Sequence, residues 1–313
     1  MDITTHRKGT MRYVGVAVTT LALLLGTCRS FAQNQAPEPT DRPLPDITTL
    51  MSQVEANERK SEAVQKNYIY NETNTFDERD SHEAVKKTES RDTEVFWLNG
   101  VPVQRTLKRD GKPLTEDEAR KENERIDGIV KKARERREKA DANGKETDPR
   151  GHEELTLARI LELGRFSDPR RDVMNGRSTI VVDYLGDPKA KTHNYAEGVF
   201  RELAGTVWVD EQDRTLVRLE GHFGHDFKIA GGLGANVKEG TWFKVAFTKI
   251  NDEVWLPAAM EGDGHVRYLL FFKLDGHFKG RTSNYRKFSA TSTILPGVTT
   301  VEPSSQPEPP PQL

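Results

Sequence analysis

The residues that come nearest to a chemical motif are two histidines and an aspartate in a short glycine-containing segment. The chain reads Gly-His-Phe-Gly-His-Asp-Phe from position 221, which brings His222, His225 and Asp226 close together in sequence. Such side chains can bind zinc or another divalent ion, with a fourth ligand from His265 or His277. In an extended segment the two histidines point to opposite faces, unless the intervening glycine marks a bulge. A metal-dependent hydrolase using His222 and His225 is therefore an alternative to two polar residues at a sheet edge.

Other fragments that resemble catalytic motifs are incomplete. His82-Glu83 and His152-Glu153 each begin like a zinc-protease helix but lack the second histidine that would share the metal. The glycines of 231–234 are not followed by the Gly-Lys-Ser or Gly-Lys-Thr of a phosphate loop. No serine lies in a Gly-x-Ser-x-Gly elbow. The sequence therefore predicts a protein without catalytic residues and without a cofactor.

The part of the chain that must position any binding site is rich in strand-forming residues between Gly205 and Pro257. Residues 206–210 and 215–220 predict one hairpin, and residues 241–250 and 254–256 predict a second. The second hairpin alternates apolar and polar side chains, which is typical of a sheet with one face in water. Such a sheet must cover its apolar face, so the question of function becomes what occupies that face.

Apolar and aromatic side chains of this sheet, with those of an early helix, are the candidate ligand-binding residues. Most buried aromatic residues are plain core, so a ligand-binding concavity is the bolder of two interpretations. The predicted apolar site consists of Ile47, Leu50, Met51, Val54, Trp208, Phe243, Val245, Phe247, Trp255, Tyr268, Leu270 and Phe272.

The first 32 residues have the pattern of a secretory signal. Cationic residues precede the apolar run Val14 to Leu25, and Ser30-Phe31-Ala32 suits cleavage before Gln33. Leu25-Gly26-Thr27-Cys28 also resembles a lipobox, so lipidation of Cys28 and anchoring to the outer membrane form an alternative. Cys28 is the only cysteine, which excludes an intramolecular disulfide. We expect export across the inner membrane to the periplasm.

Composition separates a packed region from polar ends and argues against nucleic acid as a partner. Residues 33–45 carry several prolines and predict a tether, and residues 291–313 predict a disordered Pro-rich tail. The formal net charge is −2, and removal of the basic first 32 residues makes the remainder more acidic. A nucleic-acid interface would need a basic face.

Three helices are expected from apolar residues at helical spacing. The first follows Asp46, a plausible N-cap, and fades before Asn67. The second is the charged segment 115–141, whose narrow stripe of Ile126, Ile129, Val130 and Ala133 suits either a helix packed at the edge of its own domain or a partner-docking helix. The third covers residues 157–164, and residues 194–203 suggest a short fourth.

Further strands are expected on both sides of these helices. Residues 68–76, 82–92, 94–98 and 101–107 predict strands, with Asn99-Gly100 as a hairpin turn. Residues 178–185 and 266–274 predict two more, and residues 285–288 suit a strand that closes the sheet.

Taken together, four features of the chain resemble the LolA-like superfamily of periplasmic lipoprotein carriers. They are the signal, the early helix, the unit Gly205-Thr206-Val207-Trp208-Val209-Asp210 and the unit from Gly240-Thr241-Trp242 to Trp255-Leu256-Pro257. The resemblance covers roughly residues 46–288, and residues 46–290 are expected to form a single domain. It implies an α+β fold in which a curved antiparallel β-sheet, an unclosed β-barrel, has helices on its concave face. The chain departs from the standard carrier in its length and in the charged insertion 115–141.

The resemblance implies a secreted, noncatalytic carrier or binding protein for a lipid or lipid-modified protein of the bacterial envelope. Its partners would be a lipid or an acylated protein. An alternative on the same fold is an envelope-sensing module that binds another envelope protein.

Overall fold

The structure is a computed structural model that describes residues 42–80, 82–144, 147–152, 154–229, 235–268 and 272–287, without the side chains of residues 229, 235, 267, 268 and 272–274. The predicted signal, most of the tether, the glycine segment 231–234 and the Pro-rich tail lie outside the described residues and stay predictions. The chain divides into two units, residues 1–38 and residues 39–313, and the description below concerns the second.

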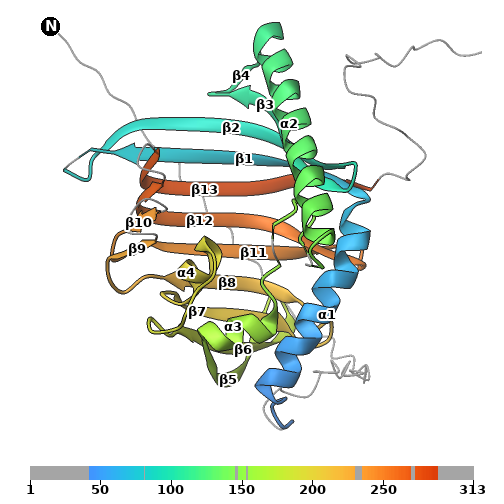
Figure 1. The fold of residues 1–313 in the computed structure, drawn as a ribbon, viewed down its shortest axis with the longest axis vertical. Helices are drawn as coiled ribbons and strands as arrows, with labels where there is room; N and C mark the ends of the chain where they lie inside the picture. The colour runs from blue at the N-terminus through green and yellow to red at the C-terminus, as the bar shows by residue number, and fades with distance from the viewer. Residues whose placement is uncertain are drawn as a thin grey trace, which may run out of the picture. The chain divides into compact units, whose positions relative to one another are not determined.

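The second unit combines four helices and thirteen strands in its described residues (Figure 1). The helices are α1 (Ile47–Gln65), α2 (Glu116–Asp141), α3 (Leu157–Leu163) and α4 (Tyr195–Phe200). The strands are β1 (Tyr68–Arg79), β2 (Val85–Leu98), β3 (Val101–Arg109), β4 (Lys112–Pro113), β5 (Gly164–Met174), β6 (Arg177–Gly186), β7 (Ala204–Asp210), β8 (Leu216–His222), β9 (Phe227–Ile229), β10 (Ala235–Val237), β11 (Trp242–Ile250), β12 (Val254–Tyr268) and β13 (Phe272–Lys287).

All strands belong to one antiparallel sheet with two open ends. Its order is β4-β3-β2-β1-β13-β12-β11-β8-β7-β6-β5, and β10 joins β9 to the side of β12. Strand β1 pairs with β13 across Phe76 and Phe278, which brings the two ends of the domain sequence together in the middle of the sheet. The terminal strands β4 and β5 are not paired with each other in the described part, so the sheet is an unclosed barrel.

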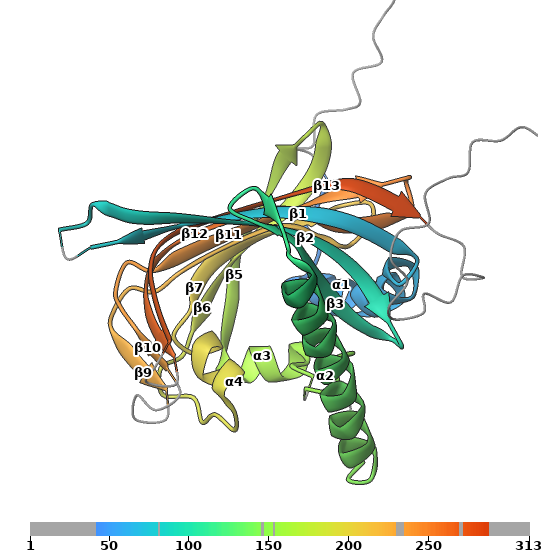
Figure 2. The ribbon, with the colours of Figure 1, turned by 90° about the horizontal axis from the view of Figure 1, so that it is seen from above.

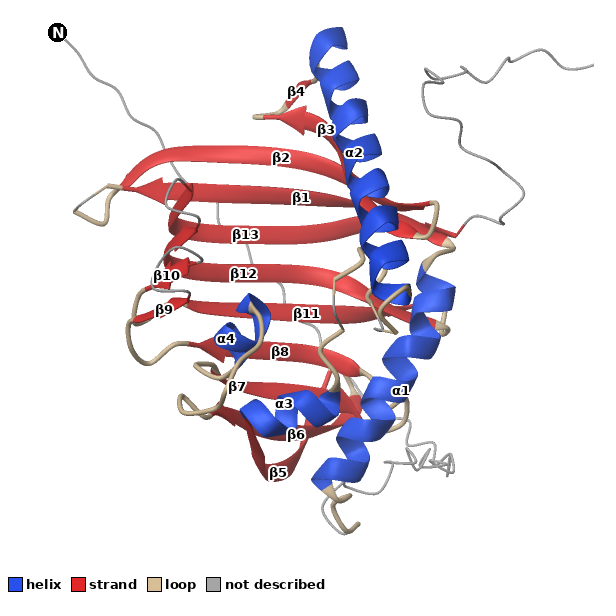
Figure 3. Cartoon of the chain, in the orientation of Figure 1, coloured by secondary structure: helices blue, strands red, loops and turns tan. Residues whose placement is uncertain are grey.

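The helices lie on the concave side of the curved sheet, as Figure 2 shows. Figure 3 shows α1 crossing the ends of the central strands, with α3 and α4 over β6 to β8. The predicted α+β class, with a curved antiparallel sheet and helices in its concavity, is therefore confirmed. Among the described helices, none is both long enough and apolar enough to cross a bilayer.

Helix α1 begins where the sequence predicts and buries the predicted stripe. The side chain of Asp46 accepts a hydrogen bond from the backbone N–H of Thr49 at 2.8 Å, which satisfies one unpaired donor of the first turn. Leu50, Met51 and Val54 are buried at the centre of a cluster. Their partners in this cluster come from α3 and from two neighbouring strands of the sheet: Leu157, Ile180, Val182 and Val209.

Helix α2 is the predicted charged helix, and it packs on its own domain. It begins with a capping box between Thr115 and Glu118. Ile126 and Ala133 are buried against Phe96, Val101 and Val103 of the β2–β3 hairpin. These contacts agree with the interpretation that the narrow apolar stripe of α2 packs at the edge of its own domain.

Most predicted strands are present, including both hairpins between Gly205 and Pro257. The Asn99-Gly100 turn has positive φ at both residues (52° and 73°), as a tight hairpin requires. The prediction of one strand over residues 266–274 is wrong, because β12 ends at Tyr268 and β13 begins at Phe272, with these two residues paired antiparallel. An apolar run on both sides of a reversal resembles one strand in sequence.

Strand β5 was not predicted. It contains Pro169 and several charged residues, which weakens the strand signal. The Asn175-Gly176 pair, with φ of 51° and 76°, turns β5 into β6 and is the sequence signal that could have identified it.

Candidate functional site: a groove on the sheet beside helix α2

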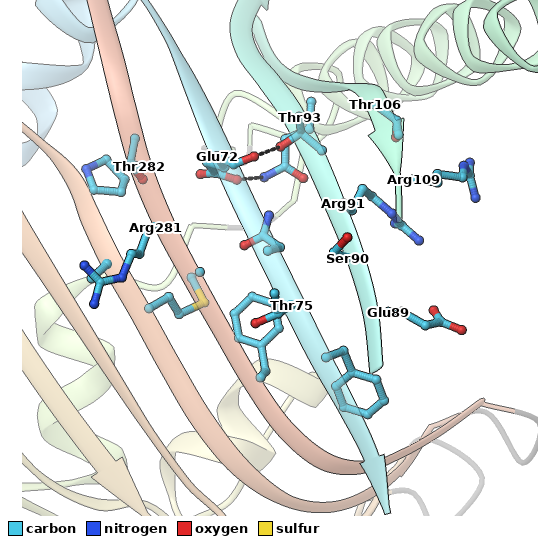
Figure 4. Close-up of a pocket in the computed structure, with 18 of the residues that line it drawn as sticks. Glu72, Thr75, Glu89, Ser90, Arg91, Thr93, Thr106, Arg109, Arg281 and Thr282 are labelled. Carbon is cyan, nitrogen blue, oxygen red and sulfur yellow. Dashed lines mark hydrogen bonds between the residues drawn. The ribbon is translucent and has the colours of Figure 1, made fainter. Parts of the chain in front are cut away.

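A groove of about 760 Å³ is bounded by β1, β2, β3, β11, β12, β13 and the first half of α2 (Figure 4). This volume lies within the range of about 300–1,000 Å³ that is usual for small-molecule sites. Because the groove draws on seven elements from distant parts of the sequence, its shape depends on strand register.

Part of the groove is apolar. Phe76 of β1 is directly opposite Phe278 of β13, and Val245 of β11 is directly opposite Met260 of β12. All four side chains line the groove, together with Pro257. Met260 is 45% exposed, which is unusual for a large apolar side chain in the middle of a sheet. These side chains form a patch that can receive an apolar ligand.

The rest of the groove is polar and carries both signs of charge. Figure 4 shows Glu72, Arg91, Thr93, Thr106 and Arg109 among its lining residues. The side-chain amide of Gln104 donates to Glu72 Oε2 at 3.1 Å. The hydroxyl of Thr93 donates to the backbone carbonyl of Glu72 at 3.5 Å. The groove thus joins an apolar patch to a belt of hydrogen-bonding and charged groups.

Burial changes the protonation of Glu72. Removal of its carboxylate from water raises its pKa, and a hydrogen bond from Asn74 and the charge of Arg150 act in the opposite direction. A half-buried carboxyl with a raised pKa is common at functional sites, although structural networks produce it too. In the described residues, the Glu72 carboxylate is hydrogen-bonded to the side-chain amides of Gln104 and Asn74.

The α2 wall of the groove is held by an ion pair between a buried carboxylate and a half-exposed arginine. Glu122 is 5% exposed and accepts a hydrogen bond from the backbone N–H of Thr106 at 2.7 Å. Arg125 donates to both oxygens of Glu122, at 2.9 and 2.7 Å, and to the backbone carbonyl of Gln104 at 2.5 Å. Burial alone would raise the pKa of Glu122, but the hydrogen bonds from Arg125 and Thr106 outweigh it and lower the pKa to about 2.

These contacts satisfy backbone groups on the outer edge of β3. Strand β3 pairs with β2 on one side and, at Lys108 and Arg109, with the short β4 on the other. The Thr106 N–H and the Gln104 carbonyl are thus bonded by side chains of α2. A covered edge does not recruit another strand, and it gives the groove a rigid wall.

The predicted apolar site residues occupy several different places. The four residues of the helix stripe, Ile47, Leu50, Met51 and Val54, pack in the cluster under α1. Val245 lines the groove. Phe243 packs beside the buried cluster of Phe223, Phe227 and Val237.

The remaining predicted aromatic residues lie elsewhere or outside the description. Trp208 is half-buried and donates its indole N–H to Asp172 at 3.3 Å. Trp255 donates to Asp213 at 2.8 Å, and Phe247 is half-buried. Leu270 and the side chains of Tyr268 and Phe272 lie outside the described residues, so their place at a ligand site stays a prediction.

The histidine segment makes separate surface contacts. His222 and His225 are exposed, and His225 Nε2 lies 3.0 Å from Glu202 Oε2. Asp226 pairs with Lys238. Within the part of the chain that the structure describes, no three His, Cys, Asp or Glu side chains are grouped closely enough to hold a metal ion.

Sequence reasoning missed most residues of the groove. Glu72, Arg91, Arg109, Glu122 and Arg125 resemble ordinary solvent-facing charges on strands and on a charged helix. The one local signal was Met260, an apolar residue in the weakly alternating run that follows Pro257.

Comparison with known proteins shows structural likeness without sequence likeness. No protein-family model matches the chain, and no curated protein matches it at the threshold applied. A domain described as an outer membrane lipoprotein-sorting protein from Vibrio parahaemolyticus is 13% identical, with 77% of this chain and 93% of that chain covered and a TM-score of 0.35. A LolA superfamily protein from Nitrosomonas europaea is 7% identical, with 79% and 95% covered and a TM-score of 0.33.

A third similar structure is the MucA/MucB complex from Pseudomonas aeruginosa, at 7% identity, with 76% of this chain and 99% of that chain covered and a TM-score of 0.22. The matches therefore include the superfamily that the sequence resembles.

Proposed function

We propose that this chain is a noncatalytic envelope protein that binds the acyl chain of a lipid or of a lipid-modified protein, and that the groove beside α2 is its site. The observation that carries the proposal is the apolar patch of Phe76, Phe278, Val245 and Met260, which lies within a hollow of about 760 Å³. Met260 leaves apolar surface exposed that a ligand would cover.

The energy available to such a site suits a carrier. Burying about ten acyl methylenes at about 0.8 kcal/mol each contributes roughly 8 kcal/mol, which corresponds to about micromolar affinity before the cost of ordering the ligand. Affinity of this order permits both capture and release. No reactive side chain is needed for either step.

The proposal includes the organisation expected from the sequence. Residues 1–32 would direct export, residues 33–45 would form a tether, and residues 46–290 would form one binding domain with the charged insertion at 115–141. Native mass spectrometry of the protein purified from a bacterial envelope would report a bound lipid and show whether the mature chain begins at a lipidated Cys28 or at Gln33.

The site is tested by placing a charge in its apolar patch. We expect Met260→Glu to weaken binding of a fluorescent long-chain fatty acid by about tenfold or more, because a lost apolar contact of about 1.5 kcal/mol changes affinity by that factor. The matched control is Val173→Glu on β5, another exposed apolar side chain (55% exposed, against 45% for Met260) outside the groove. The control should bind within about twofold of the unmodified protein.

Two results would overturn the proposal. One is equal binding by the Met260→Glu variant and the unmodified protein, which would exclude this groove. The other is absence of fatty-acid binding by the unmodified protein together with recovery of a lipid-free envelope protein complex, which would favour the protein-binding alternative.

A further inference from the structure

The groove contains two arginines that are directly opposite each other in the register of neighbouring strands. Arg91 of β2 is directly opposite Arg109 of β3 in the antiparallel register, and both line the groove. Side chains in such a pair have Cβ atoms about 4.5–5.5 Å apart, and like charges there are destabilising. Both arginines are exposed. The pairing thus places two like charges directly opposite each other on neighbouring strands, which disfavours the folded sheet.

The carboxylates near the two arginines are engaged elsewhere. Glu89 pairs with Lys87, and Asp110 accepts a hydrogen bond from the backbone N–H of Ser90 at 2.8 Å. Glu118 accepts hydrogen bonds from the backbone and hydroxyl of Thr115, both at 2.8 Å, in the capping box of α2. These hydrogen bonds lower the pKa of Glu118, and the charge of Arg109 makes a smaller contribution in the same direction. Among the described residues, no carboxylate lies within 4.0 Å of the Arg91 or Arg109 guanidinium.

Other groups around the pair are neutral hydrogen-bonding side chains. Asn74 is directly opposite Arg91 on the other side, in β1. Thr93 of β2 and Thr106 of β3 are also directly opposite each other, and both line the groove. Guanidinium groups present several N–H donors in a fixed plane, which suits the oxygens of a phosphate.

We propose that Arg91 and Arg109 form an anion subsite for a phosphate group at the polar end of the groove. The inference rests on the proposed function in one respect: the apolar patch of Phe76, Phe278, Val245 and Met260 would hold the chain of the same amphiphile. A bound phosphate would relieve the repulsion between the two guanidinium groups. The ligand class is therefore an acyl or alkyl chain that carries a phosphate.

The test compares two amphiphiles with the same chain and different head groups. Dodecyl phosphate should bind the unmodified protein at least about tenfold more tightly than dodecyl glucoside, because charge-assisted hydrogen bonds to phosphate are roughly twice as strong as neutral ones. Arg91→Gln and Arg109→Gln should each reduce this preference to less than about threefold while leaving dodecyl glucoside binding unchanged within about twofold.

The matched control is Arg165→Gln, an exposed arginine of β5 at the far end of the sheet order. It should keep the full preference for dodecyl phosphate. Neither groove variant should lower the urea midpoint of unfolding, because each removes a like-charge contact. An unchanged preference in both groove variants would overturn the inference.

Binding of inorganic phosphate distinguishes a free phosphate from a lipid head group as the source of the anion. It also distinguishes the anion-subsite proposal from the lipid-carrier proposal. Binding of inorganic phosphate that is lost in Arg91→Gln, without binding of either amphiphile, would support the anion subsite and contradict the lipid-carrier proposal. Equal binding of dodecyl phosphate and dodecyl glucoside would support the carrier proposal and overturn the anion subsite. Failure of all three probes to bind would overturn both.

Discussion

The two halves of the concave face differ in what covers them. Over β6 and β7, α1 and α3 bury a continuous apolar cluster that includes Leu50, Leu157, Ile180 and Val209. In the other half, α2 packs on apolar side chains at one end of the β2–β3 hairpin, and the surface of β1 to β3 beside this contact is an open groove with many polar side chains. An antiparallel sheet can leave one face in water wherever its side chains are polar.

This difference indicates which half is available to a ligand. In the packed half, a ligand would have to displace α1, and it would expose several fully buried side chains. In the open half, a ligand needs no displaced helix. A ligand site lined by the α1 stripe, as the sequence predicts, requires α1 to move, whereas the groove requires no movement. The following experiments separate these two possibilities.

The largest expected effect concerns the packed half. Leu50→Ala should lower the free energy of unfolding by about 3 kcal/mol, because a fully buried leucine is replaced by a cavity. Urea denaturation measures this loss. The control is Leu161→Ala on α3, which is 37% exposed and should cost less than about 1 kcal/mol.

A loss below about 1 kcal/mol for Leu50→Ala would contradict the packed half as described. It would mean that α1 contributes little to the folded core. The α1 stripe would then be free to line a ligand site, as the sequence alone suggested.

The second effect concerns the wall of the open half and depends on pH. The folded pKa of Glu122 is lowered from 4.5 to about 2, so its ion pair stabilises the fold above about pH 4.5 and loses this contribution as the pH falls through 2. Glu122→Gln should therefore lower stability at pH 7 by up to roughly 3 kcal/mol, with the difference disappearing near pH 2.

Chemical denaturation at a series of pH values measures the Glu122 effect. Glu124→Gln is the control, since Glu124 is an exposed carboxylate on the same helix. If the loss of stability in Glu122→Gln were independent of pH, the side chain would act through its shape rather than its charge.

The smallest effect concerns the floor of the groove. Burial raises the pKa of Glu72, so its ionised form opposes folding once the pH rises above the ordinary glutamate range. Glu72→Gln should increase stability at pH 7 by less than about 1 kcal/mol and should have no stabilising effect at pH 3. A loss of stability at pH 7 would show that the ionised carboxylate is needed by the fold.

Local patterns were sufficient where neighbours in sequence carry the structure. The Asp46 cap and the spacing of Leu50, Met51 and Val54 predict α1 and its buried face correctly. The Asn99-Gly100 pair predicts its hairpin. Two wrong predictions have local causes as well. Strand β5 is charged and lacks an apolar alternation, and the apolar run 266–274 contains a chain reversal.

The sequence by itself determined the helices and most strands, because each of these follows from periodicity and turn residues within a few positions. The α+β class with an open antiparallel sheet was implied by the family resemblance. Only the tertiary structure decided where the groove lies. Strand register pairs Arg91 with Arg109, and it pairs Phe76 with Phe278 from a distant segment of the chain. Charged residues on strands look alike in sequence whether they face bulk water or one another, so pairing across the sheet had to assign their roles.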